Sequence, residues 1–208
     1  MKTSQLHTYK NNYKLREHQK KLLQILKKKF NRKFNGTILD AGCAQGVFLM
    51  HFKKQFPDSK VVGIDTSAEL ISKSRKLNIP HSKFYKRDFL KIMGKYDLVF
   101  ASGVLGYYDN FINPLNKLIS LTKKGGKLFI FSHFNSLNID TLIRFRNNFN
   151  SNKWERGLNS FSLFTIRKFL KKKKTNFKIL KFDIPINLRK RENPIISYTI
   201  NTLKNKKM

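Results

Sequence analysis

Three aspartates, Asp40, Asp65 and Asp88, lie at the carboxyl ends of three successive predicted strands. The 208-residue chain has only 12 acidic residues, so their placement is informative. In open α/β sheets, ligands bind in the crevice outside the carboxyl ends of the strands. A single aspartate there could simply begin a turn, because Asp is common in turns. The three together favour a ligand site at this edge of the sheet.

A glycine-bearing turn follows the first of these strands, and its sequence is Asp40-Ala41-Gly42-Cys43-Ala44-Gln45-Gly46. Glycine lets the backbone approach a ligand closely. A dinucleotide turn requires G-x-G-x-x-G, so that pyrophosphate lies on a helix N-terminus, but Ala44 and Val47 replace the second and third glycines. The carboxylate of Asp40 would also repel pyrophosphate. It suits a ligand that is cationic near the turn, such as S-adenosylmethionine, which carries an ammonium and a sulfonium group.

The other two aspartates suit the remaining parts of the same ligand. The carboxylate of Asp65 can accept hydrogen bonds from two ribose hydroxyls. Asp88 can accept a hydrogen bond from an adenine amino group, and the ring of Phe89 can lie on the base. The predicted cofactor is therefore S-adenosylmethionine, and its product is S-adenosylhomocysteine (SAH).

The elements that must position these residues alternate between strand and helix, which predicts an α/β fold with a parallel sheet covered on both faces. The predicted strands are Thr37–Ala41, Lys60–Asp65, Lys83–Lys86, Tyr96–Ala101 and Lys127–Ser132. The predicted helices are Tyr13–Phe30, Val47–Phe56, Ser67–Leu77 and Asn113–Leu121. Ser67 is a predicted N-cap, and Lys124–Gly126 is a predicted turn.

The pattern after Ser132 predicts two more helices and two more strands. The helices are Ile139–Phe149 and Phe164–Leu170, with a loop over Asn150–Asn159, and the strands are Phe177–Ile186 and Ile195–Leu203. No linker divides the chain, so we expect a single domain over residues 1–208. It comprises a helical cap at 1–34, a cofactor-binding core at 35–135 and an acceptor-side region at 136–208.

The ordered segments Ile38–Gly46, Val61–Asp65, Phe84–Phe89, Tyr96–Tyr108 and Lys124–Phe131 resemble a class I S-adenosylmethionine-dependent methyltransferase. The family's first motif is an acidic residue followed by glycine-x-glycine-x-glycine, and Asp40, Gly42, Ala44 and Gly46 match it with one departure. The resemblance implies a Rossmann-like three-layer sandwich whose seven strands are ordered 3-2-1-4-5-7-6, with the seventh antiparallel. Residues 177–186 and 195–203 would then be strands six and seven.

The resemblance also implies which residues hold the cofactor. These are Asp40, Gly42, Cys43, Ala44, Gly46, Asp65, Thr66, Asp88, Phe89, Ser102 and Gly103. The backbone after the fourth strand, at Ala101-Ser102-Gly103, typically completes the pocket in this family.

Several methyltransferase subclasses do not fit. The segment Ala101–Tyr108 lacks the Asn/Asp-Pro-Pro-aromatic motif of enzymes that methylate nucleic-acid amino groups. Cys43 lies in the cofactor turn, so it cannot serve as the nucleophile that pyrimidine-carbon methylation requires. Ser132-His133 offers no ligand pair for a metal-assisted catechol-type enzyme, and no metal site is predicted. The chain therefore resembles the small-molecule group, with a sugar or metabolite hydroxyl as the preferred acceptor.

Candidate acceptor residues follow the fourth and fifth strands. His133 is the candidate catalytic base, although a surface histidine would have the same pattern. Tyr107, Tyr108 and Asp109 could line the acceptor pocket, and ordinary packing is an equal alternative for the tyrosines. The resemblance implies that the N-terminal helix and residues 134–175 carry the lid and the acceptor site. Residues 134–175 include Trp154, Arg144, Arg146 and Arg156, and a lid lined by arginines would suit an anionic acceptor.

The net charge of +32 leaves a nucleic-acid partner open. Only 10 of the 44 basic residues are Arg, the residue best suited to phosphate and guanine contacts, and the many Lys and Asn residues also fit an AT-rich genome. The runs Lys27–Lys29 and Lys171–Lys174 suit helix ends or a basic patch. An RNA-modifying methyltransferase and a non-catalytic binding or scaffold protein of the same fold are therefore the alternatives.

The expected location is cytoplasmic. No window approaches the roughly 20 apolar residues of a membrane span, and the N-terminus lacks the apolar region of a secretory signal. Cys43 is the only cysteine, which excludes an intrachain disulfide and a Cys-based zinc site. A reducing compartment fits this cysteine usage. The oligomeric state is not predicted.

Overall fold

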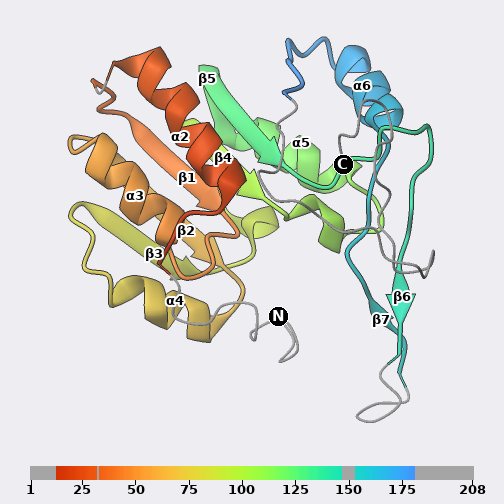
Figure 1. Cartoon of the computed structure of the whole chain (residues 1–208), viewed down its shortest axis with the longest axis horizontal. Helices are drawn as coiled ribbons and strands as arrows, with labels where there is room; N and C mark the ends of the chain where they lie inside the picture. The colour runs from red at the N-terminus through yellow and green to blue at the C-terminus, as the bar shows by residue number, and fades with distance from the viewer. Residues whose placement is uncertain (1–12, 32, 147–152, 181–208) are drawn as a thin grey trace, which may run out of the picture. The chain divides into compact units, whose positions relative to one another are not determined.

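A five-stranded parallel sheet forms the centre of the computed structural model, which describes residues 13–31, 33–146 and 153–180 (Figure 1). Its strands are β1 (Thr37–Ala41), β2 (Lys60–Asp65), β3 (Ser82–Lys86), β4 (Tyr96–Ser102) and β5 (Thr122–Phe131). Their order is β3-β2-β1-β4-β5, and every neighbouring pair is parallel. The chain reverses its direction of travel across the sheet between β3 and β4, so the carboxyl ends of β1 and β4 lie side by side.

Helices cover both faces of the sheet, as expected for parallel strands with helical crossovers. They are α2 (Glu17–Phe30), α3 (Val47–Gln55), α4 (Ala68–Arg75), α5 (Ile112–Leu121) and α6 (Leu163–Lys172), with short 3₁₀ helices η2 (Phe89–Lys91) and η3 (Leu105–Tyr107). Buried side chains of α2, α3 and α4 pack with Ile38 in one core. Leu118 and Leu121 of α5 pack with Leu39 in another. Since Ile38 and Leu39 are neighbours on β1, the two cores lie on opposite faces.

The five predicted strands are confirmed, and β1 and β2 have the predicted bounds. The predicted turn Lys124–Gly126 differs, because it lies within the bounds of β5. Tyr96 pairs with Thr122 and Leu98 pairs with Lys127, so the register shifts where the glycines lie. Gly125 has φ +79°, which glycine adopts without a Cβ penalty. The glycines therefore form an irregularity in β5 rather than a turn that precedes it.

The predicted helix Ile139–Phe149 is wrong over its described part. Residues 144–145 form β6 (Arg144–Phe145), which pairs antiparallel with β7 (Glu155–Arg156) in the predicted loop (Figure 1). Thr141 also pairs with Ser160 in an isolated bridge. These backbone bonds to residues further along the chain replace the i to i+4 bonds that the apolar spacing had suggested. Residues 147–149 lie outside the described residues.

The helix predicted over Phe164–Leu170 is confirmed as α6. The two predicted strands after it are not seen. Residues 177–180 are described and are not in a strand, and the rest of 177–186 and all of 195–203 lie outside the described residues. The seven-stranded order with an antiparallel seventh strand stays a prediction.

The chain divides into two compact units, Met1–Asn176 and Phe177–Met208. The single domain predicted for residues 1–208 stays a prediction. No helix in the described part of the chain is long and apolar enough to cross a membrane.

Candidate functional site

The glycine turn after β1 is held by β2 and lies against the segment after β4. The backbone N–H groups of Gly42 and Cys43 both donate to the carbonyl of Ile64, at 2.8 and 2.9 Å. Gly42 has φ +83°, and a Cβ on it would lie 2.7 Å from Cγ2 of Val104. Any other residue would be strained at this φ, and its Cβ would clash with Val104. The turn is therefore closely packed between the ends of β2 and β4.

Asp65 braces the same turn from the end of β2. Its Oδ2 accepts a hydrogen bond from the N–H of Ala44 at 3.0 Å, and its Oδ1 accepts one from the N–H of Ser67 at 2.9 Å. Ala44 has φ +49°, a conformation that this bond helps to hold. Each carboxylate oxygen has a further lone pair, so Asp65 can still accept from a ligand hydroxyl.

Asp40 lies near the end of β1, just before the turn, and is buried with an unsatisfied oxygen. The side chain is 2% exposed, and its Oδ1 has no hydrogen-bond partner among the described residues. Burial, and then the nearby charge of Asp65, raise the pKa of Asp40 well above its usual value. A buried carboxylate without a partner is unfavourable, and a cationic group beside it would offset that cost. The site therefore fits a ligand that brings positive charge to this turn.

Four other predicted cofactor residues lie near the same sheet edge in different environments. Oδ1 of Asp88 accepts from the N–H of Leu90 at 2.9 Å and caps η2. Phe89 is buried in the core, edge-on to the ring of Tyr108 at 6.0 Å. Thr66 is exposed and Cys43 is buried. The ring of Phe89 packs in the core, which leaves little of it for a ligand. Its predicted contact with adenine stays a prediction.

Ser102 ends β4 beside the glycine turn. Ala101 pairs with Ala41 in the parallel register, which places the residues that follow each of them at the same edge. Gly103 donates its N–H to the carbonyl of Phe131 at 2.8 Å and has φ +71°. The structure thus brings the predicted segments Asp40–Gly46 and Ser102–Gly103 together.

A residue that the sequence analysis did not single out, His18 of α2, contacts this edge. Its Nε2 lies 2.8 Å from Oγ of Ser102, and its ring stacks on that of Phe131 with centroids 3.9 Å apart. Burial, and then the charges of Arg16 and His133, lower the pKa of His18 to about 4. Helical spacing at the N-terminus identifies apolar residues only, so it gave no signal for this contact.

His133, the predicted base, follows β5 and is exposed. Its ring lies edge-on to Phe131, with centroids 5.9 Å apart. The rings of His18 and His133 therefore both contact Phe131, one by stacking and one by its edge. The predicted catalytic role of His133 is not tested by this geometry.

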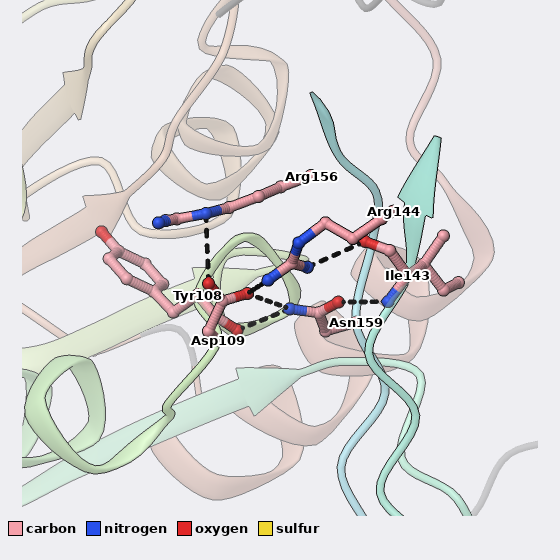
Figure 2. Close-up of polar contacts among 6 residues, drawn as sticks. All are labelled: Tyr108, Asp109, Ile143, Arg144, Arg156 and Asn159. Atoms are coloured by element: carbon pink, nitrogen blue, oxygen red, sulfur yellow. Dashed lines mark hydrogen bonds and ion pairs between the residues drawn. The ribbon is translucent and has the colours of Figure 1, made fainter. Parts of the chain in front are cut away.

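Asp109 joins the segment after η3 to the β6–β7 ribbon (Figure 2). Its Oδ1 lies 2.8 Å from Nη2 of Arg144, and its Oδ2 lies 3.2 Å from Nε of Arg156. Nδ2 of Asn159 donates to Oδ1 of Asp109 and to the carbonyl of Tyr108, at 3.2 and 2.9 Å. Desolvation raises the pKa of Asp109, but the bonds from Arg144 and Asn159 and the two arginine charges outweigh it and lower the pKa.

Of the predicted acceptor residues, Asp109, Arg144 and Arg156 come together, with the two arginines sharing one carboxylate. Two guanidinium groups face a single negative charge, so the cluster retains positive charge. Tyr107 is exposed, whereas Tyr108 is partly buried. Burial, and then the charge of Asp88, raise the pKa of Tyr108 to about 12, so its phenol stays protonated near neutral pH.

Comparison with known proteins identifies what this chain is similar to. Residues 9–181 match the protein family described as "Methyltransferase domain". Malonyl-[acyl-carrier protein] O-methyltransferase 1 of Ilyobacter polytropus is 30% identical over 125 residues, which are 58% of this chain and 46% of that protein. Trans-aconitate 2-methyltransferase of Deinococcus radiodurans is 26% identical over 93 residues, which are 45% of this chain and 36% of that protein. The chain spans less than half the length of these curated relatives.

A solved structure also resembles this fold. It is the plantazolicin methyltransferase BpumL in complex with a pentazolic desmethylPZN analog and SAH. The TM-score is 0.51 at 26% sequence identity, and the superposition covers 62% of this chain and 50% of that chain.

Proposed function

Because this chain belongs to the class I S-adenosylmethionine-dependent methyltransferase family, we propose that it transfers the methyl group of S-adenosylmethionine to a small-molecule acceptor. The observation that carries the proposal is the buried carboxylate of Asp40, whose Oδ1 has no partner among the described residues. It lies near the end of β1, beside the glycine turn that Asp65 braces, at the edge of the sheet where ligands bind in such folds.

The cofactor residues follow from the environment of each side chain. Asp40 would meet the cationic part of S-adenosylmethionine, Asp65 its ribose hydroxyls and Asp88 its adenine. The backbone at Gly103 would approach it closely, since a Cβ there would point into open space, and Gly42 would keep the turn packed against Val104. When bound, this cofactor supplies an electrophilic methyl group on a sulfonium.

The acceptor in this proposal is an anionic metabolite that is methylated on oxygen, with a hydroxyl preferred. Arg144 and Arg156 support an anionic acceptor, because within the described residues both guanidinium groups pair with the one carboxylate of Asp109. Arginine suits carboxylate and phosphate groups through paired N–H donors. The names of two relatives specify acids as acceptors, malonyl-[acyl-carrier protein] and trans-aconitate, which agrees with this charge.

His133 is the proposed proton acceptor for the hydroxyl. It lies after β5 on the ligand side of the sheet, beside the ring of Phe131. Positioning alone supplies much of the rate in a direct transfer, so we expect the base to add a smaller factor. A His133→Ala variant is expected to lose about 100-fold in kcat, and wild-type kcat across pH 5–9 would exclude the role.

Calorimetric titration of the protein with SAH tests the cofactor part of the proposal. Saturable heat at a stoichiometry near one is expected, and no heat and no rise in melting temperature would overturn it. Binding of SAH without methyl transfer to any acceptor would instead favour the non-catalytic alternative. Preferential methylation of RNA, with an affinity that falls steeply with salt, would favour the RNA-modifying one.

A panel of acidic metabolites and their matched neutral amides tests the acceptor part, with transfer of a labelled methyl group as the readout. Arg144→Ala and Arg156→Ala are each expected to raise KM for acidic acceptors about tenfold, with little change for the amides. Arg167→Ala is the matched control, because Arg167 is an exposed arginine of α6. Unchanged KM in both variants would exclude an anionic acceptor held by these arginines.

A further inference from the structure

The contact between His18 and Ser102 joins a helix outside the central sheet to the edge where β1 and β4 end. The two residues are 84 positions apart in the chain, and Nε2 of His18 lies 2.8 Å from Oγ of Ser102. We propose that His18 is a positioning residue of the cofactor pocket, which holds the Ser102 hydroxyl beside the glycine turn. The proposal rests on the proposed function, since it concerns the pocket for S-adenosylmethionine.

His18 is held firmly enough to position a neighbour. Its ring is parallel to that of Phe131 within 3°, with centroids 3.9 Å apart. The helix that carries it is anchored by Leu22, Leu23 and Leu26, which are buried against the core. A ring fixed on one face by stacking and at Nε2 by a hydrogen bond has little rotational freedom left.

Ser102 is the residue through which His18 would act on the cofactor. The pairing of Ala101 with Ala41 places Ser102 next to the start of the glycine turn. The close approach of Gly42 to Val104 also brings the segment that follows β4 against the turn. A displacement of Ser102 would therefore disturb the edge where the glycine turn and the segment after β4 meet.

An uncharged His18 suits a position beside the proposed site for a cationic ligand. Burial, and then the charges of Arg16 at the N-cap of α2 and of His133 after β5, lower the pKa of His18 to about 4. The ring is therefore neutral near pH 7. A neutral imidazole does not repel a cationic ligand, and its Nε2 can accept the hydroxyl hydrogen of Ser102. The oxygen of Ser102 then keeps lone pairs to accept a hydrogen bond from a ligand N–H group.

A merely structural role for His18 makes different predictions. The same ring packs on Phe131, and the N-terminal segment has a second tether, in which Nε2 of His51 lies 3.0 Å from the carbonyl oxygen of Tyr13. His18→Phe keeps a ring for the stack and removes the hydrogen bond. His18→Gln keeps a group that can accept from Ser102 and removes the ring. His51→Ala loosens the tether and leaves Ser102 untouched.

Calorimetric titration with SAH, after circular dichroism and melting curves have shown that each variant folds, separates these roles. We expect His18→Phe and Ser102→Ala each to weaken SAH binding about tenfold, and the double variant to bind no more weakly than either single one. His18→Gln is expected to restore most of the affinity, and His51→Ala to bind as the wild type does.

The outcomes distinguish this proposal from the proposed function. Wild-type protein that does not bind SAH would overturn both. Binding by the wild type, with equal affinity in His18→Phe, would overturn only the positioning role. Losses in His18→Phe and Ser102→Ala that multiply in the double variant would also overturn it, because independent effects are additive in free energy.

Discussion

Oδ2 of Asp65 accepts a hydrogen bond from the backbone N–H of Ala44 at 3.0 Å, across 21 positions of the chain. One residue at the end of β2 therefore fixes the shape of the turn after β1. Ala44 has a positive φ of 49°, where a non-glycine residue is uncommon, and this bond stabilises it there. The carboxylate of Asp65 therefore stabilises the turn, and in the proposed function it also accepts hydrogen bonds from the ribose hydroxyls.

Asp65→Ala is expected to lower the free energy of unfolding by roughly 3 kcal/mol, because two backbone N–H groups lose a charged acceptor. SAH affinity should fall at least tenfold as well. Urea unfolding and calorimetry measure the two effects. Asp58→Ala, which removes an exposed carboxylate from the loop after α3, is the control. Stability equal to that of the control would show that the two bonds do not hold the turn.

Asp40 should make the protein less stable as the pH rises. Burial favours the neutral carboxyl in the folded state, so the pKa there lies well above the 3.8 of the exposed group. The folded state then binds the proton more tightly than the unfolded state. The free energy of unfolding therefore falls between pH 3.8 and the raised pKa, and the loss is complete above it.

Asp40→Asn should remove this loss. The difference in unfolding free energy between the variant and the wild type is expected to grow with pH through that window, in favour of the variant, as measured by urea unfolding from pH 4 to 8. SAH affinity should move in the opposite direction and fall about tenfold, because an amide does not attract a cation as a carboxylate does. A difference that is constant with pH would contradict the raised pKa.

Much of the sheet was predictable because its signals are local. The strands β1 and β2 are short apolar runs between turn residues, and both have the predicted bounds. Ser67 was predicted as an N-cap, and its Oγ accepts from the N–H of Leu70 at 3.3 Å. The three aspartates were predicted to lie at one edge, which follows from the parallel order of the strands.

Contacts between distant segments could not be predicted in the same way. His18 reaches Ser102 only because α2 packs across the sheet, and a single sequence carries no pattern for that pairing. The residues after β5 have helical apolar spacing, yet they form β6 because Arg144 and Phe145 pair with β7. Tertiary pairing outweighed local preference there.

Asn159 is the centre of the polar contacts that hold the ribbon to the segment after β4 (Figure 2). It is 1% exposed; its Oδ1 accepts from the N–H of Ile143 at 2.8 Å, and its own N–H donates to the carbonyl of Gly106 at 2.7 Å. Its Nδ2 donates to the carbonyl of Tyr108 at 2.9 Å. One buried residue therefore satisfies three backbone groups, and these lie in two separate segments.

Asn159→Ala is expected to lower the free energy of unfolding by about 2–3 kcal/mol, because the backbone groups of Ile143 and Tyr108 lose their partners. Proteolysis should also cut the segment around β6 and β7 faster. Asn135→Ala is the matched control, since its amide makes similar local bonds to Leu137 and Ile139 in an exposed setting. Equal losses in the two variants would contradict a special role for the buried amide.

Gly63, in the middle of β2, lets the glycine turn pack against β3. A Cβ at this position would lie 2.6 Å from the ring of Phe84 and 2.9 Å from Sγ of Cys43, within the turn itself. The backbone of Gly63 is not in the positive-φ region, so the obstacle is steric alone. Gly63→Ala is expected to cost about 1–3 kcal/mol of stability, as in other overpacked cores. Displacement of Cys43 should also weaken SAH binding.

The double variant Gly63→Ala/Phe84→Leu tests whether the ring of Phe84 is the cause. A leucine leaves room for the new methyl group, so the double variant should lose less stability than the sum of the two single variants. Urea unfolding of the three proteins gives the coupling, and SAH titration shows whether the turn recovers with it. Additive losses would mean that the strain arises at Cys43, in which case relief of the ring would leave SAH affinity low.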